Sequence, residues 1–144
     1  MDALLLDTDV FSFLMKGRDE RAEAYRSHIQ GKTIAVSFVT VGEIHFGAAK
    51  RGWASKRIRA FSERLKAVVV VPSDNEVCKK YGQLKAELQS KGIVVSDNDL
   101  WIAACAIRHS VVLVSNNRRH FQNIPELSLL SLAPEVPPVS GGLF

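Results

Sequence analysis

Short, continuous runs of apolar residues, separated by longer helical stretches, most limit the folds open to this chain. The clearest runs cover residues 3–6, 33–37, 67–71 and 111–115, and a weaker fifth run covers 127–132. They have the length of β-strands but lack the apolar/polar alternation of a half-exposed strand. Such runs are typical of parallel strands that helices cover on both faces of a sheet.

Between these runs, apolar residues recur at the spacing of an amphipathic helix. Val77, Tyr81, Leu84 and Leu88 form one such series. Because strands and helices alternate along the chain, we expect an α/β fold. We expect one domain over residues 1–133, followed by a Pro/Gly-rich tail over 134–144.

Charge and hydropathy narrow the classes of function. The chain has 144 residues, with 19 Lys and Arg against 15 Asp and Glu, so its formal net charge is +4. A basic chain favours a polyanionic partner such as nucleic acid. No apolar stretch approaches the roughly 18 residues of a membrane span, and the N-terminus does not resemble a signal peptide, so we expect a cytoplasmic protein without a membrane partner.

Two cysteines, Cys78 and Cys105, lie in separate helical patterns and outside any Cys/His cluster. That arrangement excludes a disulfide framework and a zinc site. We therefore expect both to be buried small apolar side chains.

Five acidic residues lie in or against apolar stretches, near the ends of the predicted strands: Asp7, Asp9, Glu43, Asp97 and Asp99. In open α/β sheets, ligands bind beyond the carboxyl ends of the strands. If these acids converge there, they form an acidic pocket inside an otherwise basic surface.

Helix capping is the alternative interpretation of each acid. Asp7 or Asp9 suits the start of a helix over residues 10–15. Residues 40–43 and 96–99 both match the capping-box pattern, which would give Glu43 and Asp99 purely structural roles. Two acids directly after the first strand, and two before the apolar segment 100–104, exceed what capping requires.

Carboxylates that meet in a low-dielectric pocket repel one another unless a cation compensates their charge. Oxygen ligands without Cys or His favour Mg²⁺ or Mn²⁺. Such an ion can activate a water molecule and neutralise charge on a phosphoryl group. With a basic rim for a nucleic-acid backbone, the implied reaction is phosphodiester hydrolysis.

Four segments of the chain carry a family resemblance. They read LLDTDV at 5–10, SFVTVGEI with FGA at 37–48, DLWIAA at 99–104, and LVSNN at 113–117 followed by Phe121. In this order they resemble the signature blocks of PIN-domain ribonucleases, in particular the VapC-type toxins of type II toxin–antitoxin systems. The resemblance runs from about residue 4 to residue 132.

The resemblance implies a PIN-like three-layer α/β/α fold with a five-stranded parallel sheet. It also implies an Mg²⁺-dependent endoribonuclease, with Mn²⁺ able to substitute, that cleaves transfer or ribosomal RNA and inhibits translation as the toxin of a toxin–antitoxin pair. A homodimer and a cognate VapB-type antitoxin that joins it in a hetero-oligomer are the implied partners.

The acids of the family fall on Asp7, Glu43 and Asp99, and its fourth position falls on Asn117, which contributes no charge. We expect Asp7 and Asp99 to bind Mg²⁺, and Glu43 to bind it through water or to act as general base. Asp97 is a further candidate metal ligand that could supply the missing carboxylate.

Other polar residues complete the expected site. Thr8, Ser115 and Asn117 are expected to position ligands by hydrogen bonds. The basic residues expected to hold RNA are Lys50, Arg51, Arg118 and Arg119.

Three alternative hypotheses for the function of the chain remain open. Asp7-Thr8-Asp9-Val10 also fits the first motif of haloacid-dehalogenase-like phosphatases, in which Asp7 would be a phosphorylated nucleophile. A non-catalytic module that binds RNA or a protein partner would use the acids only as caps. A pair of histidines could also perform acid–base cleavage without metal.

Overall fold

The computed structural model describes residues 2–17 and 19–135 of the chain. Five strands form one sheet in the order β3-β2-β1-β4-β5, and all neighbouring strands are parallel. The strands are β1 (Ala3–Leu6), β2 (Thr33–Ser37), β3 (Val69–Val71), β4 (Val112–Val114) and β5 (Leu129–Leu130). The helices are α1 (Thr8–Met15), α2 (Glu20–Ile29), α3 (Phe38–Arg51), α4 (Ser55–Lys66), α5 (Asn75–Ser90), α6 (Asp97–Arg108) and α7 (Arg118–Phe121).

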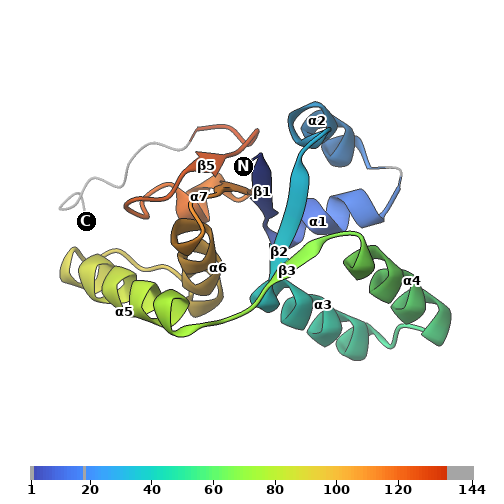
Figure 1. Cartoon of the computed structure of the whole chain (residues 1–144), viewed down its shortest axis with the longest axis horizontal. Coiled ribbons are helices and arrows are strands. Elements are labelled where there is room, and N and C mark those ends of the chain that lie inside the picture. Colours follow the sequence, from blue (N-terminus) through green and yellow to red (C-terminus); the bar gives the residue numbers. More distant parts are fainter. Residues whose placement is uncertain (1, 18, 136–144) are drawn as a thin grey trace.

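Alternate residues of the central strand pack into two separate cores. Leu5 belongs to the core with α5 and α6, whereas Leu4 and Leu6 belong to the core with α1, α2 and α4. Successive side chains of a strand point to opposite faces, so β1 is covered on both sides, as its continuous apolar sequence predicted. Figure 1 shows these two groups of helices on either side of the sheet. The predicted three-layer α/β/α fold is confirmed.

The edge strand β3 departs from the predicted burial. Val69 and Val70 are exposed, whereas Val71 is buried in the core. An edge strand has no neighbour on one side, so its side chains are less completely covered than those of β1. The strand pairing is also shorter than the apolar runs 67–71, 111–115 and 127–132.

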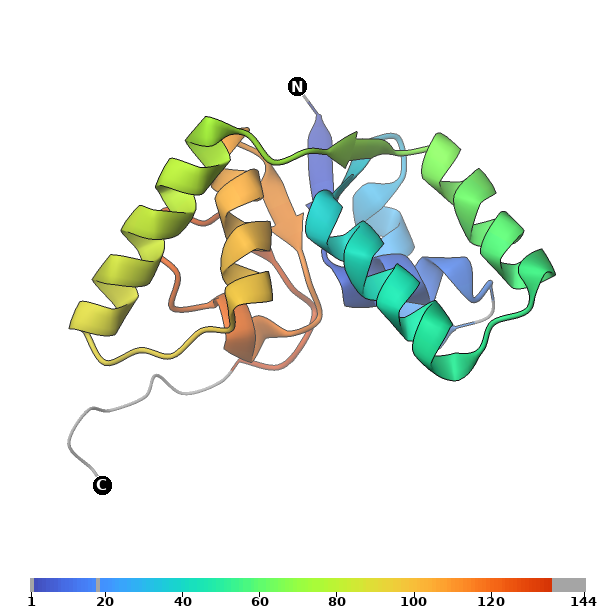
Figure 2. The ribbon, with the colours of Figure 1, turned by 90° about the horizontal axis from the view of Figure 1, so that it is seen from below.

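The carboxyl ends of the central strands lead directly into helices. Asp7 alone separates β1 from α1, and β2 passes into α3 without a loop. Viewed from below, α3 and α6 flank the sheet on opposite sides (Figure 2). The loop after β4 and the start of α6 therefore meet the ends of β1 and β2 along one rim.

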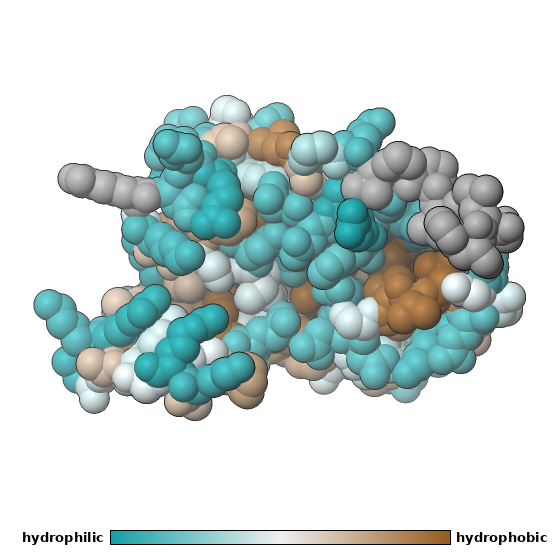
Figure 3. All heavy atoms as spheres, turned by 180° about the vertical axis from the view of Figure 1, so that it is seen from behind, coloured by the Kyte–Doolittle hydropathy of each residue, from teal (hydrophilic) through white to brown (hydrophobic). Residues whose placement is uncertain are grey.

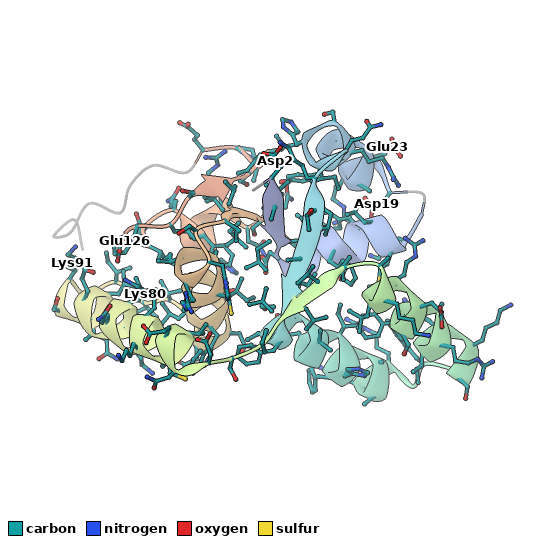
Figure 4. The ribbon with its side chains drawn as sticks, in the orientation of Figure 1. Asp2, Asp19, Glu23, Lys80, Lys91 and Glu126 are labelled. Atoms are coloured by element: carbon teal, nitrogen blue, oxygen red, sulfur yellow. The ribbon has the colours of Figure 1, made fainter. Side chains whose placement is uncertain are left out.

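Side-chain hydrogen bonds and an ion pair hold the C-terminal part of the domain in place. Arg118 donates from Nε to the carbonyl oxygen of Ala133 (3.0 Å) and from Nη2 to that of Ser131 (2.7 Å). Lys80 on α5 and Glu126 point toward each other (Figure 4), with 3.2 Å between Nζ and Oε2. The predicted tail over 134–144 lies largely outside the described residues, since 136–144 are not described.

Two further expectations concern the burial of the two cysteines and the presence of a membrane-spanning helix. Cys105 is buried, as expected, but Cys78 is exposed, so the expectation that both are buried was wrong for Cys78. None of the described helices is both long and apolar enough to cross a membrane.

Candidate active site

An acidic pocket of about 550 Å³ opens at the carboxyl ends of the strands. Its lining residues come from the starts of α1 and α6, from α3, and from the turn after β4. They are Asp7, Thr8, Asp9, Glu43, Ser96, Asp97, Asn98, Asp99, Asn117 and His120. The structure therefore brings acids from three separate chain segments to one place, together with Asn117 and His120 from a fourth.

Asp7 is both a helix cap and the most deeply buried acid of the pocket. It is 4% exposed, its Oδ1 accepts the amide of Thr8 (2.8 Å), and its Oδ2 accepts the hydroxyl of Ser115 (2.7 Å). Burial, and next the charge of Asp9, raise the pKa of Asp7 to about 7, against the lowering effect of these hydrogen bonds and with a smaller raising effect from Asp99. Asp7 thus caps α1 and lines the pocket at the same time.

Asp9 lies beside Asp7 and is hydrogen-bonded to the turn after β4. Its Oδ2 accepts the amide of Asn116 (3.0 Å), and its Oδ1 accepts the amide of Val10 (2.6 Å). Burial raises the pKa of Asp9, although these backbone hydrogen bonds act in the opposite direction. Asp9 therefore adds negative charge to the pocket while it positions a neighbouring loop.

Glu43 is tied to α1 through a hydroxyl chain. Thr8 donates its only hydroxyl proton to Oε1 of Glu43 (2.6 Å), so the Thr40 hydroxyl, 2.9 Å away, must donate to Thr8. The Nδ2 of Asn98 also approaches Oε2 of Glu43 at 3.4 Å. This chain fixes one carboxylate oxygen of Glu43 at the edge of the pocket.

The capping box predicted over residues 40–43 was wrong. The cap of α3 is Ser37, whose Oγ accepts the amide of Thr40 (3.2 Å). Because Ser37 ends β2 and caps the helix at once, α3 begins earlier than the pattern suggested. Glu43 consequently lies in the second turn, where its side chain is available to Thr8.

Asp99 enters the pocket from the first turn of α6. Ser96 caps this helix and accepts the amide of Asp99 (3.3 Å), which is half of the predicted capping box. The carboxylate of Asp99 instead contacts His120, with 3.1 Å between Oδ2 and Nδ1. Its side chain keeps 17% of its surface exposed and so faces the pocket.

Asp97 lines the pocket, but its carboxylate is already bound by two residues of α5, and its role as a further metal ligand stays a prediction. Its Oδ1 accepts the hydroxyl of Tyr81 (2.7 Å) and the ammonium of Lys85 (2.9 Å). These two contacts, the tyrosine first, lower the pKa of Asp97. Two residues of α5 thus already compensate the charge of Asp97. The carboxylate that lies beside Asp7 is that of Asp9.

The turn after β4 supplies Ser115 and Asn117. Ser115 is fully buried, and its Oγ also accepts the amide of Asn117 (3.0 Å), which shapes the turn around the Asp7 carboxylate. Asn117 is exposed at the pocket wall. Asn117 therefore faces the pocket, whereas Ser115 lies behind Asp7, and their roles in positioning ligands stay predictions.

The four expected RNA-binding residues separate into different environments. Arg118 donates to the backbone carbonyls of Ser131 and Ala133, which gives it a structural role, and its contact with RNA stays a prediction. Arg119 is exposed on α7. Lys50 and Arg51 lie at the end of α3, outside the acidic pocket, and line a neighbouring groove.

His120 and Asn98 were missed by sequence reasoning. His120 stands in a basic turn three residues after Asn117, and only the start of a helix at Arg118 turns it toward Asp99. Asn98 lies between Asp97 and Asp99, and no sequence pattern distinguished it from a residue of the helix cap. The expected alternative of a histidine pair finds no support among the described residues, because His120 is the single histidine of the pocket and His45 packs against Phe61.

The donor chemistry of the pocket fits a hard divalent cation. Asp7 is buried and Asp9 is partly buried, and burial raises the pKa of both carboxyls, which outweighs the small lowering effect of His120 on Asp9. Among the described residues, no three His, Cys, Asp or Glu side chains converge as a ready-made metal cage. Mg²⁺ does not need one, because it is commonly bound by one or two carboxylates and several waters. Asp7 and Asp99 are the residues that would hold it.

Comparison with known proteins agrees with the family resemblance seen in the sequence. Residues 4–127 match the PIN domain family. Ribonuclease VapC2 of Haemophilus influenzae (strain Rd) is 30% identical over 120 residues, which cover 83% of this chain and 90% of that protein. The tRNA(fMet)-specific endonuclease VapC of Salmonella typhimurium is 28% identical over 125 residues, covering 87% of this chain and 94% of that protein.

A solved structure agrees with the architecture described above. The structure of VapBC2 from Rickettsia felis, bound to a DNA fragment from its promoter, matches with a TM-score of 0.79 and 27% identity. The match covers 90% of this chain and 98% of that chain.

Proposed function

Because this chain belongs to the PIN-domain family and to its VapC-type ribonucleases, we propose that it is an Mg²⁺-dependent endoribonuclease that cleaves transfer or ribosomal RNA. By this cleavage it inhibits translation in the cytoplasm, as the toxin of a toxin–antitoxin pair. Membership of this family replaces the phosphatase and non-catalytic alternatives.

One observation carries the proposal. Asp7, a buried carboxyl with a raised pKa, lies beside Asp9 and in the field of Asp99 at the carboxyl ends of the strands. Burying several acids together is unfavourable unless a cation offsets their charge. An Mg²⁺ ion held by Asp7 and Asp99 would supply charge neutralisation at the phosphoryl group and would increase the acidity of water.

The residues of the chain then have distinct roles in hydrolysis. Asp7 is kept in position by Ser115 and Thr8, and Asp99 is kept in position by His120. Glu43, oriented by Thr8, accepts a proton from the attacking water. As the water oxygen bonds to phosphorus, the bond from phosphorus to one ribose oxygen breaks, and that oxygen leaves with the bonding electron pair and takes a proton from solvent water. Asn117 orients the substrate or a water at the pocket wall.

Substrate and partners follow from the relatives. The Salmonella typhimurium relative is named a tRNA(fMet)-specific endonuclease, which supports transfer RNA as the first substrate to test. The Rickettsia felis relative was solved as a VapBC complex, which supports a VapB-type antitoxin as partner of this chain. The proposed assembly is a homodimer that binds this antitoxin.

The test is to incubate the purified chain with total RNA, in Mg²⁺ or in EDTA, and to sequence the newly formed RNA ends. We expect discrete cuts within transfer or ribosomal RNA that need Mg²⁺. Cuts that persist in EDTA, or RNA that stays intact in Mg²⁺, would contradict the proposal. Cuts spread over messenger RNA alone would overturn the substrate assignment.

A further inference from the structure

A second, larger groove lies beside the acidic pocket and is continuous with it. The groove has a volume of about 1460 Å³ and runs between α1, α3 and α4. Thr8, Glu43 and Asn98 line both hollows, so a ligand can pass from one to the other without leaving the surface. In Figure 3 the surface is indented beside the end of the molecule that α3 and α4 form, and hydrophilic side chains lie along its rim.

The lining of this groove has the opposite charge from the pocket. Its cations come from α3, from α4 and from the residue that follows α1, and Glu43 is its single carboxylate among the described residues. The cations are Lys16, Lys50, Arg51, Arg57 and Arg64. A polyanion that enters the acidic pocket would therefore be attracted along the groove.

These groove cations lack carboxylate partners, although the guanidinium carbon of Arg57 lies 4.0 Å from the ring centroid of Trp53. Elsewhere, most lysines and arginines are paired, for example Lys80 with Glu126 and Lys85 with Asp97. Among the described residues, no carboxylate forms an ion pair with any of the five groove cations. Their charge is thus available to an external anion.

One face of α3 extends from the acidic pocket, at Glu43, to the cations of the groove, at Lys50. Glu43, Phe46 and Lys50 stand at helical positions i, i+3 and i+7, so they lie on one face and all line the groove. Lys50 is about 10 Å along the helix axis from Glu43, at about 1.5 Å per residue. On α4, Arg57 and Arg64 are likewise seven residues apart and line the opposite wall.

An exposed aromatic ring lies between these charges. Phe46 is 67% exposed, and the ammonium of Lys50 lies 5.8 Å from its ring centroid. A large apolar ring that is left uncovered inside a basic groove suits a base that is not paired in a duplex, because unpaired bases stack on aromatic side chains while phosphates contact cations.

We propose that the groove between α1, α3 and α4 holds an unpaired stretch of the RNA substrate next to the cleaved bond. This inference rests on the proposed function. Phosphates contact Lys50, Arg57 and Arg64, and a base stacks on Phe46. The groove thus selects RNA whose nucleotides beside the cleavage point are single-stranded.

The test measures binding of a fluorescein-labelled 12-nucleotide single-stranded RNA to the full chain, in EDTA so that cleavage does not interfere. The groove variant is Arg57→Gln/Arg64→Gln. The matched control is Lys56→Gln/Arg59→Gln, which removes the same charge from α4 at exposed positions outside the groove lining.

We expect the groove variant to bind at least about tenfold more weakly than wild type, and to reduce the slope of log affinity against log salt by about 1.4, the value for two lost phosphate contacts on a single strand. The control pair should keep most of the affinity. Equal losses in both pairs, or no loss in either, would overturn the proposal. Loss of binding to a purified antitoxin with unchanged RNA binding would assign the groove to a protein segment instead.

A second variant tests the aromatic contact. Phe46→Ala should weaken binding of the single strand by about tenfold, while Phe46→Tyr should retain it. The same RNA annealed to its complement should bind both variants equally, because paired bases cannot stack on the ring. An equal effect on duplex and single strand would overturn the assignment of Phe46. Because these measurements exclude Mg²⁺, their outcome is independent of whether the chain cleaves RNA.

Discussion

At the scale of single residues, the properties of the site follow from the burial of Asp7. Its carboxyl is held by Thr8 and Ser115, which favour the ionised form, yet burial and Asp9 outweigh them and raise its pKa to about 7. A metal-free protein therefore retains a proton at this site near neutral pH, and binding of a divalent cation must release it.

A pH-dependent stability change is expected from this carboxyl. Its pKa is about 7 in the folded chain and about 3.8 in the unfolded chain, so its contribution to stability is complete below pH 4 and is lost as the pH rises through 7. Asp7→Asn removes this loss. In EDTA at pH 8 the variant should be more stable than wild type by at least about 1 kcal/mol, a few degrees in Tm.

Thermal unfolding in EDTA between pH 4 and pH 8 measures this difference. The Tm advantage of Asp7→Asn should shrink toward pH 4, where the carboxyl is protonated in the folded chain and the pH approaches its unfolded-state pKa of about 3.8. Curves for the two proteins that run parallel across this range would show that Asp7 is not the titrating group.

At the scale of elements, the site depends on contacts between the starts of helices. Thr8 at the start of α1 orients Glu43 on α3, with Thr40 as the donor behind it. Thr8→Val should lower kcat for RNA cleavage by about 10- to 100-fold, because the carboxylate loses its positioning hydrogen bond. Thr8→Ser keeps the hydroxyl and should keep most of the rate.

The comparison of these two variants needs kcat and KM separately, at saturating Mg²⁺, with Tm as a control for folding. A loss confined to kcat in Thr8→Val would agree with a positioning role. If Thr8→Ser were as slow as Thr8→Val, the hydroxyl would not be the relevant group.

The α7 turn gives a second prediction at this scale. Arg118 donates to the carbonyls of Ser131 and Ala133, which hold β5 and the segment after it. Arg118→Ala should lower the free energy of unfolding by about 1–3 kcal/mol, as for loss of charge-assisted hydrogen bonds. Arg119→Ala, at an exposed position, should change it by less than about 0.5 kcal/mol.

Denaturant unfolding, with hydrogen exchange at Leu129 and Leu130, measures these effects. Wild-type stability in Arg118→Ala, together with weakened RNA binding, would support the original expectation that Arg118 contacts RNA.

The helix starts also explain which parts of the site the sequence could predict. Acids directly after apolar runs located Asp7, Glu43 and Asp99 correctly at one rim, because parallel strands end together. The pairing of Asp97 with Tyr81 and Lys85 could not be predicted, because it depends on how α5 packs against α6. The cap at Ser37 was missed because β2 and α3 join without a loop, and the capping pattern at 40–43 is equally good in sequence.

At the scale of the whole molecule, the five-stranded parallel sheet and the layer arrangement were predictable from hydropathy and the family resemblance, whereas the order of the strands was not predicted. The continuous apolar sequence of β1 matches its central place in the sheet, with α-helices on both faces. The groove beside the pocket was not predictable, since it requires α1, α3 and α4 to approach one another in space. Charge is consequently divided over the molecule, with carboxylates at the strand ends and uncompensated cations next to them.

The central claim is that Asp7, Glu43 and Asp99 act with Mg²⁺ as one RNA-cleaving site. Single-turnover cleavage of a transfer RNA tests it most directly, with wild type, Asp7→Asn, Asp99→Asn and the distant control Glu126→Gln, in Mg²⁺ and in EDTA. We expect wild type and Glu126→Gln to cleave in Mg²⁺ only, and both aspartate variants to be at least about 100-fold slower while they remain folded. Cleavage at the wild-type rate by either aspartate variant, or by wild type in EDTA, would contradict the account.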